Sequence, residues 1–211
     1  MTICLQLDHV NYSYGAAKIR VLSDVNADFE SGKMYAITGP SGAGKSTLLS
    51  LLAGLDAPSD GVVRFEGEDI ATTGYLKHRR EHVSLVFQDH NLIDYLTSEE
   101  NLRLVNPKAD MKILEDLGLS REESKRNIMH LSGGQRQRVA VGRALVAPGR
   151  AILADEPTGS LDPEMTDEVI DLLRHAAHQL GKCVIVVTHS KRVADSADAV
   201  YTLRHKKLAK A

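Results

Sequence analysis

Nine residues, GPSGAGKST at positions 39–47, carry the strongest chemical signal in the sequence. They fill the pattern G-x-x-x-x-G-K-[ST], in which glycines let backbone N–H groups wrap around phosphate oxygens. Lys45 would neutralise the outer phosphates of a nucleoside triphosphate, and the Ser46 hydroxyl would bind Mg²⁺. The pattern also follows an apolar run and precedes a helix-like stretch, as this loop requires. We therefore predict a triphosphate site formed by Gly39, Ser41, Gly42, Gly44, Lys45, Ser46 and Thr47.

A pair of carboxylates at the end of a second apolar run supplies the chemistry that such a loop needs. In AILADEP, at positions 151–157, Asp155 and Glu156 follow four apolar residues. Asp155 is placed to hold the Mg²⁺ shell, and Glu156 to orient or deprotonate an attacking water. An apolar run that ends in Asp-Glu says little alone, but together with the loop at 39–47 it predicts hydrolysis of a nucleoside triphosphate.

A second glycine pair, in LSGGQRQRVAVGRAL at 131–145, also has the form of a phosphate-binding turn. Ser132, Gly133, Gly134 and Gln135 would offer N–H donors at the start of a helix, where the helix dipole favours anions. Three arginines follow on this helix, at 136, 138 and 143, and they can be interpreted as a solvated face or as a nucleic-acid patch.

Four short apolar runs position these residues. They span 34–38, 83–87, 151–154 and 184–188, and they end before Gly39, Gln88, Asp155 and His189. Runs that are apolar throughout are typical of parallel strands covered on both faces. Because ligands bind past the carboxyl ends of such strands, the four ends are expected to meet at one crevice.

Helices fit between these strands. One is predicted at 45–53, and another at 163–180, where Asp162 can cap the start, Pro163 suits the first turn and Gly181 follows the end. The second helix carries an apolar stripe of Val169, Leu172, Leu173, Ala176, Ala177 and Leu180. Residues 3–30 and 61–66 alternate as in antiparallel strands. The sequence thus predicts an α/β fold with a mostly parallel sheet, an N-terminal antiparallel β flap and an inserted helical lobe.

We expect one domain over 1–211, with 1–87 and 150–211 forming the α/β core and flap, and 88–149 the helical lobe. The net charge of −2 excludes a bulk basic field for nucleic acid. Cys4 and Cys183 are interpreted as reduced, buried thiols of a cytosolic protein. The first residues lack the pattern of a signal peptide, and the apolar runs are too short to cross a bilayer.

With GPSGAGKST, LSGGQ, LADEPTGSLD and VVTHS in this order, the chain resembles the ATP-binding-cassette (ABC) ATPases over essentially all 211 residues. LSGGQ is the most specific element, since ordinary P-loop ATPases lack it. The resemblance implies a P-loop NTPase core that binds ATP and Mg²⁺. It also implies roles for four further residues.

Tyr14 matches the aromatic residue that stacks on adenine, with Tyr12 as a competitor. Gln88 matches the glutamine that touches Mg²⁺ and the water and senses the membrane partner, and His189 matches the histidine at the γ-phosphate. Asp162, in GSLD with Ser160, matches the loop that crosses the dimer interface beside the nucleotide. The expected catalytic residues are Glu156, His189 and Gln88, and the expected metal ligands are Ser46, Gln88 and Asp155.

The two glycine cradles predict a two-fold dimer. One monomer is not expected to close both cradles on one γ-phosphate, whereas a dimer can cover each chain's nucleotide with the other chain's Ser132–Gln135 turn. The resemblance implies the same arrangement, in which ATP closes the dimer and hydrolysis opens it. A homodimer is expected, although a close relative could take the place of the second copy.

The expected function is that of the ATPase subunit of a membrane transporter, on the cytoplasmic face of the membrane and without a nucleic-acid partner. Residues 87–105 resemble the ATPases of lipoprotein-release, macrolide-export and antimicrobial-peptide-export systems, whose permeases have few spans and a large extracytoplasmic domain. Leu92, Ile93, Tyr95 and Leu96 would either line the groove for a permease or pack inside the lobe. The alternative is control of a membrane signalling or cell-division complex without net transport.

Overall fold

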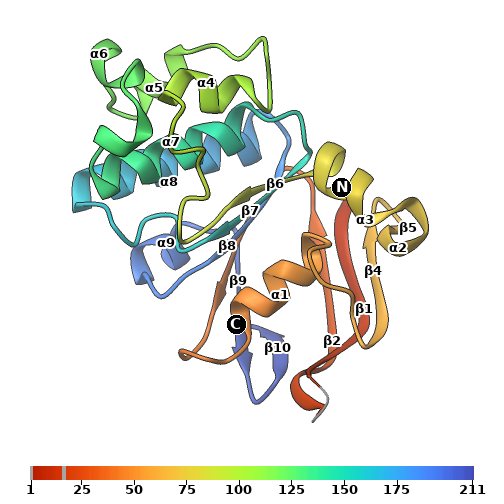
Figure 1. The fold of residues 1–211 in the computed structure, drawn as a ribbon. Helices are drawn as coiled ribbons and strands as arrows, with labels where there is room; N and C mark the ends of the chain where they lie inside the picture. Colours follow the sequence, from red (N-terminus) through yellow and green to blue (C-terminus); the bar gives the residue numbers. More distant parts are fainter. Residues whose placement is uncertain (1, 16–17) are drawn as a thin grey trace.

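Two β-sheets form the frame of the molecule (Figure 1). The computed structural model describes residues 2–15 and 18–211. The larger sheet has the order β10-β9-β3-β8-β7-β6 and is parallel except for β10. Its strands are β3 (Met34–Thr38), β6 (Val83–Val86), β7 (Ala151–Asp155), β8 (Cys183–Val187), β9 (Ala199–Arg204) and β10 (Lys207–Lys210). The prediction of four neighbouring parallel strands is confirmed, with each end within one residue of its expected place.

The second sheet is antiparallel and has the order β2-β1-β4-β5. It consists of β1 (Ile3–Tyr14), β2 (Ile19–Glu30), β4 (Asp60–Phe65) and β5 (Glu68–Asp69). In Figure 1 these strands lie to one side of the larger sheet, with helix α1 between them. The predicted N-terminal flap is therefore present, and β1 carries Tyr14 at its carboxyl end.

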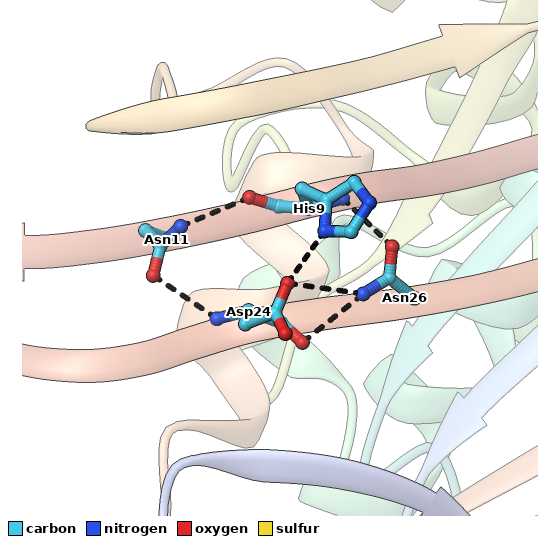
Figure 2. A network of polar contacts seen from close by, with 4 residues as sticks. All are labelled: His9, Asn11, Asp24 and Asn26. Carbon is cyan, nitrogen blue, oxygen red and sulfur yellow. Dashed lines mark hydrogen bonds and ion pairs between the residues drawn. The ribbon is translucent and has the colours of Figure 1, made fainter.

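Side chains replace regular strand pairing at one place in this flap (Figure 2). His9 on β1 and Asp24 on β2 both have φ of 50°, where the register of the two strands shifts. The His9 amide donates to Asn26 Oδ1, the Asp24 amide donates to Asn11 Oδ1, and the His9 ring lies 2.6 Å from Asp24. The Asp24 carboxylate raises the pKa of His9. These contacts satisfy backbone groups that a bulge leaves unpaired.

The helices fall into three groups. α1 (Lys45–Leu52) follows β3, and α8 (Pro163–His178) precedes β8. A lobe of helices lies between β6 and β7, and Figure 1 shows it at one end of the larger sheet. It contains α4 (Ser98–Arg103), α5 (Lys112–Asp116), α6 (Arg121–Ser124), η2 (Ile128–His130) and α7 (Gly133–Val146). The remaining elements are α2 (Ile70–Thr73), α3 (Tyr75–Lys77), the π-helix η1 (His78–His82) and α9 (Lys191–Asp195).

Each face of the larger sheet has its own hydrophobic core. Along β8, Ile185 and Val187 pack with α1 and the flap, while Val184 and Val186 pack with α7, α8 and the lobe. Because both faces are covered, every residue of β8 is buried and the strand is apolar throughout. The two cores hold the carboxyl ends of the central strands in fixed positions.

Helix α8 ends two residues earlier than predicted, at His178 and not at residue 180. Asp162 caps its start by accepting from the Met165 amide, and Val169 and Leu173 are buried, as predicted. Leu180, the last residue of the expected stripe, is 57% exposed. The helix ends at His178, so Leu180 no longer follows the helical periodicity.

No helix among the described residues is long and apolar enough to cross a membrane. The division of the chain at 88 and 149 stays a prediction.

Candidate active site

The carboxyl ends of β3, β6, β7 and β8 border a cavity of about 570 Å³. Most of the residues that line it lie at the carboxyl end of one of these strands or in the segment that follows it, and Tyr14 and Val21 come from β1 and β2. The lining residues are Tyr14, Val21, Ser41, Gly42, Gly44, Lys45, Ser46, Thr47, Gln88, Asp155, Glu156, Gly159, Ser160 and His189. Eleven of the residues predicted from the sequence are therefore brought together, and Gly39 joins them through its carbonyl group, which Lys45 contacts.

The loop between β3 and α1 depends on its glycines. Gly44 has φ of 101°, and a Cβ there would lie 2.5 Å from Val21 Cγ1. A Cβ on Gly39 would lie 2.4 Å from the Leu203 carbonyl oxygen. The start of α1 has no side-chain cap, so the N–H groups of its first turn remain available to an anion.

Lys45 is buried at the base of this loop. Its ammonium donates to the carbonyl oxygens of Gly39 (2.9 Å) and Pro40 (3.0 Å) and lies 3.3 Å from His189 Nε2. These contacts hold a full positive charge beside the free N–H groups. A phosphate oxygen is a stronger acceptor than a carbonyl oxygen because its hydrogen bonds are charge-assisted. The arrangement is suited to a polyphosphate.

Glu156 is held in a conformation that side chains rarely adopt, with φ of 48°. Its amide donates to the Val187 carbonyl oxygen, and its Oε2 accepts from Thr188 Oγ1 at 3.2 Å. Oε1 is buried, has no hydrogen-bond partner among the described residues and lies 3.6 Å from His189 Nε2. One carboxylate oxygen is thus fixed while the other stays available, which is what a group that orients or deprotonates water requires.

Thr188 is a residue that sequence reasoning missed. It is fully buried, and its hydroxyl donates to Glu156 while accepting from the Ser190 amide. Its position directly before His189 in VVTHS was visible in the sequence. Its contact with Glu156 could not be predicted, because it depends on the pairing of β7 with β8, in which Asp155 lies beside Val187.

Three oxygen-bearing side chains, Ser46, Gln88 and Asp155, line the same cavity. The part of the chain that the structure describes has no cluster of three or more His, Cys, Asp or Glu side chains of the kind that holds a metal unaided. This donor set fits Mg²⁺, because that ion is usually held by one or two protein groups together with phosphates and water.

Tyr14 and Tyr12 are separated by their surroundings. Tyr14 is 47% exposed, lines the cavity, and its hydroxyl lies 3.0 Å from Thr47 Oγ1. Tyr12 is buried and meets the edge of the Tyr14 ring, with centroids 4.9 Å apart. Of the two rings, that of Tyr14 is the one available for stacking on a base.

The second glycine cradle lies elsewhere in the monomer. Ser132 caps α7 in a capping box with Gln135, and Gln135 Nε2 donates to Glu123 Oε1 at 2.5 Å. Ser132, Gly133, Gly134 and Gln135 do not appear among the described residues that line the cavity, and nor does Asp162, which caps α8. Gly134 packs beside Ser160, which lies at the rim. The cradle is therefore next to the site but is not part of it.

These features match a known family. The family model described as ABC transporter matches residues 22–159, which include the loop at 39–47, Gln88, the Ser132–Gln135 turn and Glu156. The chain belongs to the ABC transporter family. The cassette is 37% identical to the ABC transporter ATP-binding protein YclH of Bacillus subtilis, over 92% of this chain and 90% of that protein.

The macrolide export ATP-binding/permease protein MacB of Escherichia coli K12 is 38% identical to the cassette over 97% of this chain. The alignment covers 34% of MacB, so the cassette spans about a third of that protein's length. A solved dimeric structure of MJ0796, a bacterial ABC transporter cassette, has a TM-score of 0.90 at 33% identity and covers 98% of each chain.

A second MJ0796 structure, a dimeric post-hydrolysis state bound to ADP and Pi, has a TM-score of 0.88 at 32% identity, over 98% of each chain. The fold is thus that of a P-loop NTPase core with the flap and lobe of an ABC cassette, as predicted. The cassette binds ATP and is an ATPase of the transporter type. The residues predicted to bind and hydrolyse ATP, among them Lys45, Gln88 and Glu156, meet in the cavity at the carboxyl ends of β3, β6, β7 and β8.

Proposed function

We propose that this ATPase powers a membrane transporter by closing and opening a dimer around ATP. The observation that carries the proposal is the separation of the two glycine cradles. One lines the cavity, and the other lies beside it, outside the set of lining residues. A Cβ on Gly133 would meet no described atom within 4 Å, so this turn is free to meet another molecule.

The molecule proposed to meet it is the ATP held by a second copy. Ser132, Gly133, Gly134 and Gln135 would then place N–H donors and the start of α7 against the γ-phosphate from the side opposite Lys45. Two-fold symmetry makes both sites alike. The dimeric state of the MJ0796 cassettes supports this assembly. Asp162, at the start of α8, would lie beside the same interface.

Within each site we assign separate tasks to the residues. Lys45 and the N–H groups of the loop bind the phosphates, Tyr14 stacks on the base, and Glu156, oriented by Thr188, takes a proton from the attacking water. His189 lies between Lys45 and Glu156 and contacts the γ-phosphate. Ser46, Asp155 and Gln88 would hold Mg²⁺, which offsets the charge that develops on the phosphates.

Hydrolysis then acts on the assembly. The γ-phosphate is the group that both copies hold, so its release removes the contact that closes the dimer. Because linkage is reciprocal, closure and ATP affinity strengthen each other. We propose that a permease subunit follows this movement. The combination of an ATP-binding part and a permease in MacB supports such a partner. We propose that the cassette meets it on the cytoplasmic face of the membrane.

The expectation that residues 92–96 line a permease groove or pack inside the lobe stays a prediction. Leu92 packs against the lobe core, and Tyr95 is 77% exposed. A groove of about 770 Å³ lies beside this segment, and its lining includes Phe87, Asn91, Leu104 and Val105. We propose this groove as the docking site. A partner with few spans and a large extracytoplasmic domain remains the expectation from the relatives of residues 87–105.

Copurification tests the proposal. A tagged Glu156→Gln chain is expressed in the organism from which the protein comes and is extracted in detergent with Mg-ATP. A membrane protein is expected to copurify with it. Proteoliposomes that contain both proteins are expected to hydrolyse ATP faster than the chain alone. Stimulation by DNA or ribosomes without a membrane protein would contradict the transporter role. A membrane partner that stimulates ATP hydrolysis without any movement of solute across the membrane would favour a signalling complex.

A further inference from the structure

The two cysteines of the chain stand far apart in the sequence and meet in the folded structure. Cys4 lies in β1 of the flap, and Cys183 begins β8 of the larger sheet. Both are free thiols, both are fully buried, and both belong to the core between the flap, α1 and the larger sheet. A hydrogen bond joins the two thiols. The pair therefore sits where the two sheets pack against each other.

The connector between β2 and β3 holds the segments that precede the two cysteines. The Ser31 amide donates to the Thr2 carbonyl oxygen at 3.0 Å. The next amide along the chain, that of Gly32, donates to the Lys182 carbonyl oxygen at 3.1 Å. Because two consecutive residues of the connector reach both segments, the start of β1 and the start of β8 are kept close together.

An ion pair forms a second bridge between the same two segments. The Glu66 amide, which follows β4 of the flap, donates to the Cys4 carbonyl oxygen at 2.9 Å. The Cys183 amide donates to the carbonyl oxygen of Arg150, which precedes β7, also at 2.9 Å. Arg150 Nη1 lies 2.7 Å from Glu66 Oε1. Two separate bridges thus hold the backbones of the cysteines, and the contact between their thiols does not depend on the thiols themselves.

The two thiols differ in how readily they lose a proton. A hydrogen bond with the Cys183 thiol, and then one with the Ser31 hydroxyl, lowers the pKa of Cys4. The same contact with Cys4, together with burial, raises the pKa of Cys183. The Ser31 hydroxyl is buried and makes no other hydrogen bond to the described residues. Because the thiolate and not the thiol is the nucleophile, Cys4 is the sulfur that reacts first.

We propose that Cys4 and Cys183 are a modification site, which a small hydroperoxide such as hydrogen peroxide converts to a disulfide. The Cys4 thiolate attacks one peroxide oxygen, the O–O bond breaks and hydroxide leaves, so that Cys4 becomes a sulfenic acid. The Cys183 sulfur then attacks the Cys4 sulfur, and the sulfenic hydroxyl leaves with the Cys183 proton as water. Two electrons pass from the sulfurs to the peroxide. The hydroxide takes up the proton that Cys4 lost, so the products are one disulfide and two water molecules.

Burial selects the oxidant, and the position of the pair separates it from the active site. Neither thiol is exposed, so a bulky oxidant is excluded, while a small hydroperoxide enters during brief openings of the core. The disulfide ties the flap to the larger sheet at the start of β8. His189 follows the other end of that strand, about 20 Å away at 3.3 Å per residue. Oxidation therefore stabilises the fold and leaves ATP hydrolysis unchanged, whether or not the proposed transporter function holds.

The first experiment uses the native chain. It is treated with hydrogen peroxide, unfolded without reductant and exposed to iodoacetamide. Both cysteines are expected to escape the label, and a tryptic digest should yield the Cys4 and Cys183 peptides as one linked fragment. Oxidised glutathione at the same concentration should leave both thiols free to be labelled. Two labelled thiols after peroxide, a disulfide between two copies of the chain, or equal oxidation by glutathione would overturn the inference.

Two variants test the order of the steps. In Cys183→Ser the second thiol is missing, so peroxide should leave a sulfenic acid on Cys4, which dimedone traps and mass spectrometry detects. Cys4→Ser is the matched control, and its Cys183 should give no dimedone adduct. Cys183→Ala and Cys4→Ala provide the same test if a buried serine lowers the melting temperature. An adduct on Cys183 and none on Cys4 would overturn the assignment of Cys4 as the nucleophile.

A thermal scan and an ATPase assay test the consequence of the bond. The oxidised native chain should melt about 5–15 °C above the reduced chain, the change for a disulfide that closes a long loop. Only the part that dithiothreitol reverses is counted, because methionine sulfoxide is not restored in this way. Both kcat and KM for ATP should be equal in the two forms, and peroxide should not raise the melting temperature of Cys183→Ser. An unchanged melting temperature or a lower kcat in the disulfide form would overturn the inference.

Discussion

Replacing Glu156 by glutamine isolates the chemistry of one oxygen atom. Glutamine has nearly the same shape, and its carbonyl oxygen can still accept from Thr188 Oγ1, a contact of 3.2 Å in the native chain. The atom that changes is Oε1, which is buried and has no partner among the described residues. Removing a buried carboxylate oxygen of this kind does not weaken the fold, so we expect an unchanged or slightly higher melting temperature.

The expected loss is in turnover. General base catalysis contributes about 10²–10⁴-fold, which corresponds to about 2.7–5.4 kcal/mol of transition-state stabilisation. We expect the rate constant of phosphate release in a single turnover to fall by that factor, while ATP affinity stays the same. Because the γ-phosphate remains, the chain should sediment as a dimer with Mg-ATP and as a monomer with Mg-ADP.

Thr188→Val is the matched control. It keeps the shape and the carboxylate but removes the hydroxyl that donates to Glu156, so kcat should fall only about tenfold. Near-normal turnover in Glu156→Gln would refute the assignment of Glu156 as the base. A loss in Thr188→Val as large as that in Glu156→Gln would show that geometry, and not the proton acceptor, limits the rate.

Three further results are expected. Asp162→Ala removes the cap of α8, which costs about 1 kcal/mol, and should lower the melting temperature by about 2–4 °C in a thermal scan. Tyr14→Ala should raise KM for ATP about tenfold and Tyr14→Phe should not, because stacking needs the ring and not the hydroxyl. Burial lowers the pKa of His78 below its ordinary value of 6.5, so the unfolded chain binds a proton that the folded chain refuses. The stability from a neutral His78 is therefore complete above pH 6.5 and is lost as the pH falls below it, and urea unfolding between pH 7.5 and 5.5 should show a smaller decline in His78→Gln than in the exposed control His205→Gln.

Each of these has an opposite outcome. An unchanged melting temperature in Asp162→Ala would mean that the cap contributes nothing to α8. A raised KM in Tyr14→Phe would shift the role to the hydroxyl, which contacts Thr47. An equal pH dependence in the native chain and His78→Gln would place the titrating group elsewhere.

The parallel strands were predictable because burial on both faces leaves a plain mark. Residues 34–37 and 184–187 carry no charged side chain and are all buried, and the structure places them in β3 and β8. Gly39 and His189, which follow these strands in the chain, were located for the same reason. Leu180 was not, since the end of a helix depends on capping contacts that a periodic pattern does not record.

The groove that we propose for docking could not be located from the sequence. Its walls come from η1, β6, α4 and α7, which are far apart along the chain. Leu104 and Val105 look like ordinary lobe residues, and Arg143 looks like one of three arginines on a solvated helix. His90 and Asn91 are residue types that adopt left-handed conformations more often than most, but the contacts of their carbonyl groups with Arg143 join segments about fifty residues apart and could not be predicted locally.

Helix α7 spans Gly133–Val146, and at 1.5 Å per residue its 14 residues measure about 21 Å. Its first turn belongs to the glycine cradle and its last turn carries Arg143. The two ends of α7 belong to one continuous helix, so a change in its tilt at the cradle also moves Arg143. If a second copy presents its nucleotide to the cradle, as we propose, its arrival would therefore be felt at both ends of α7.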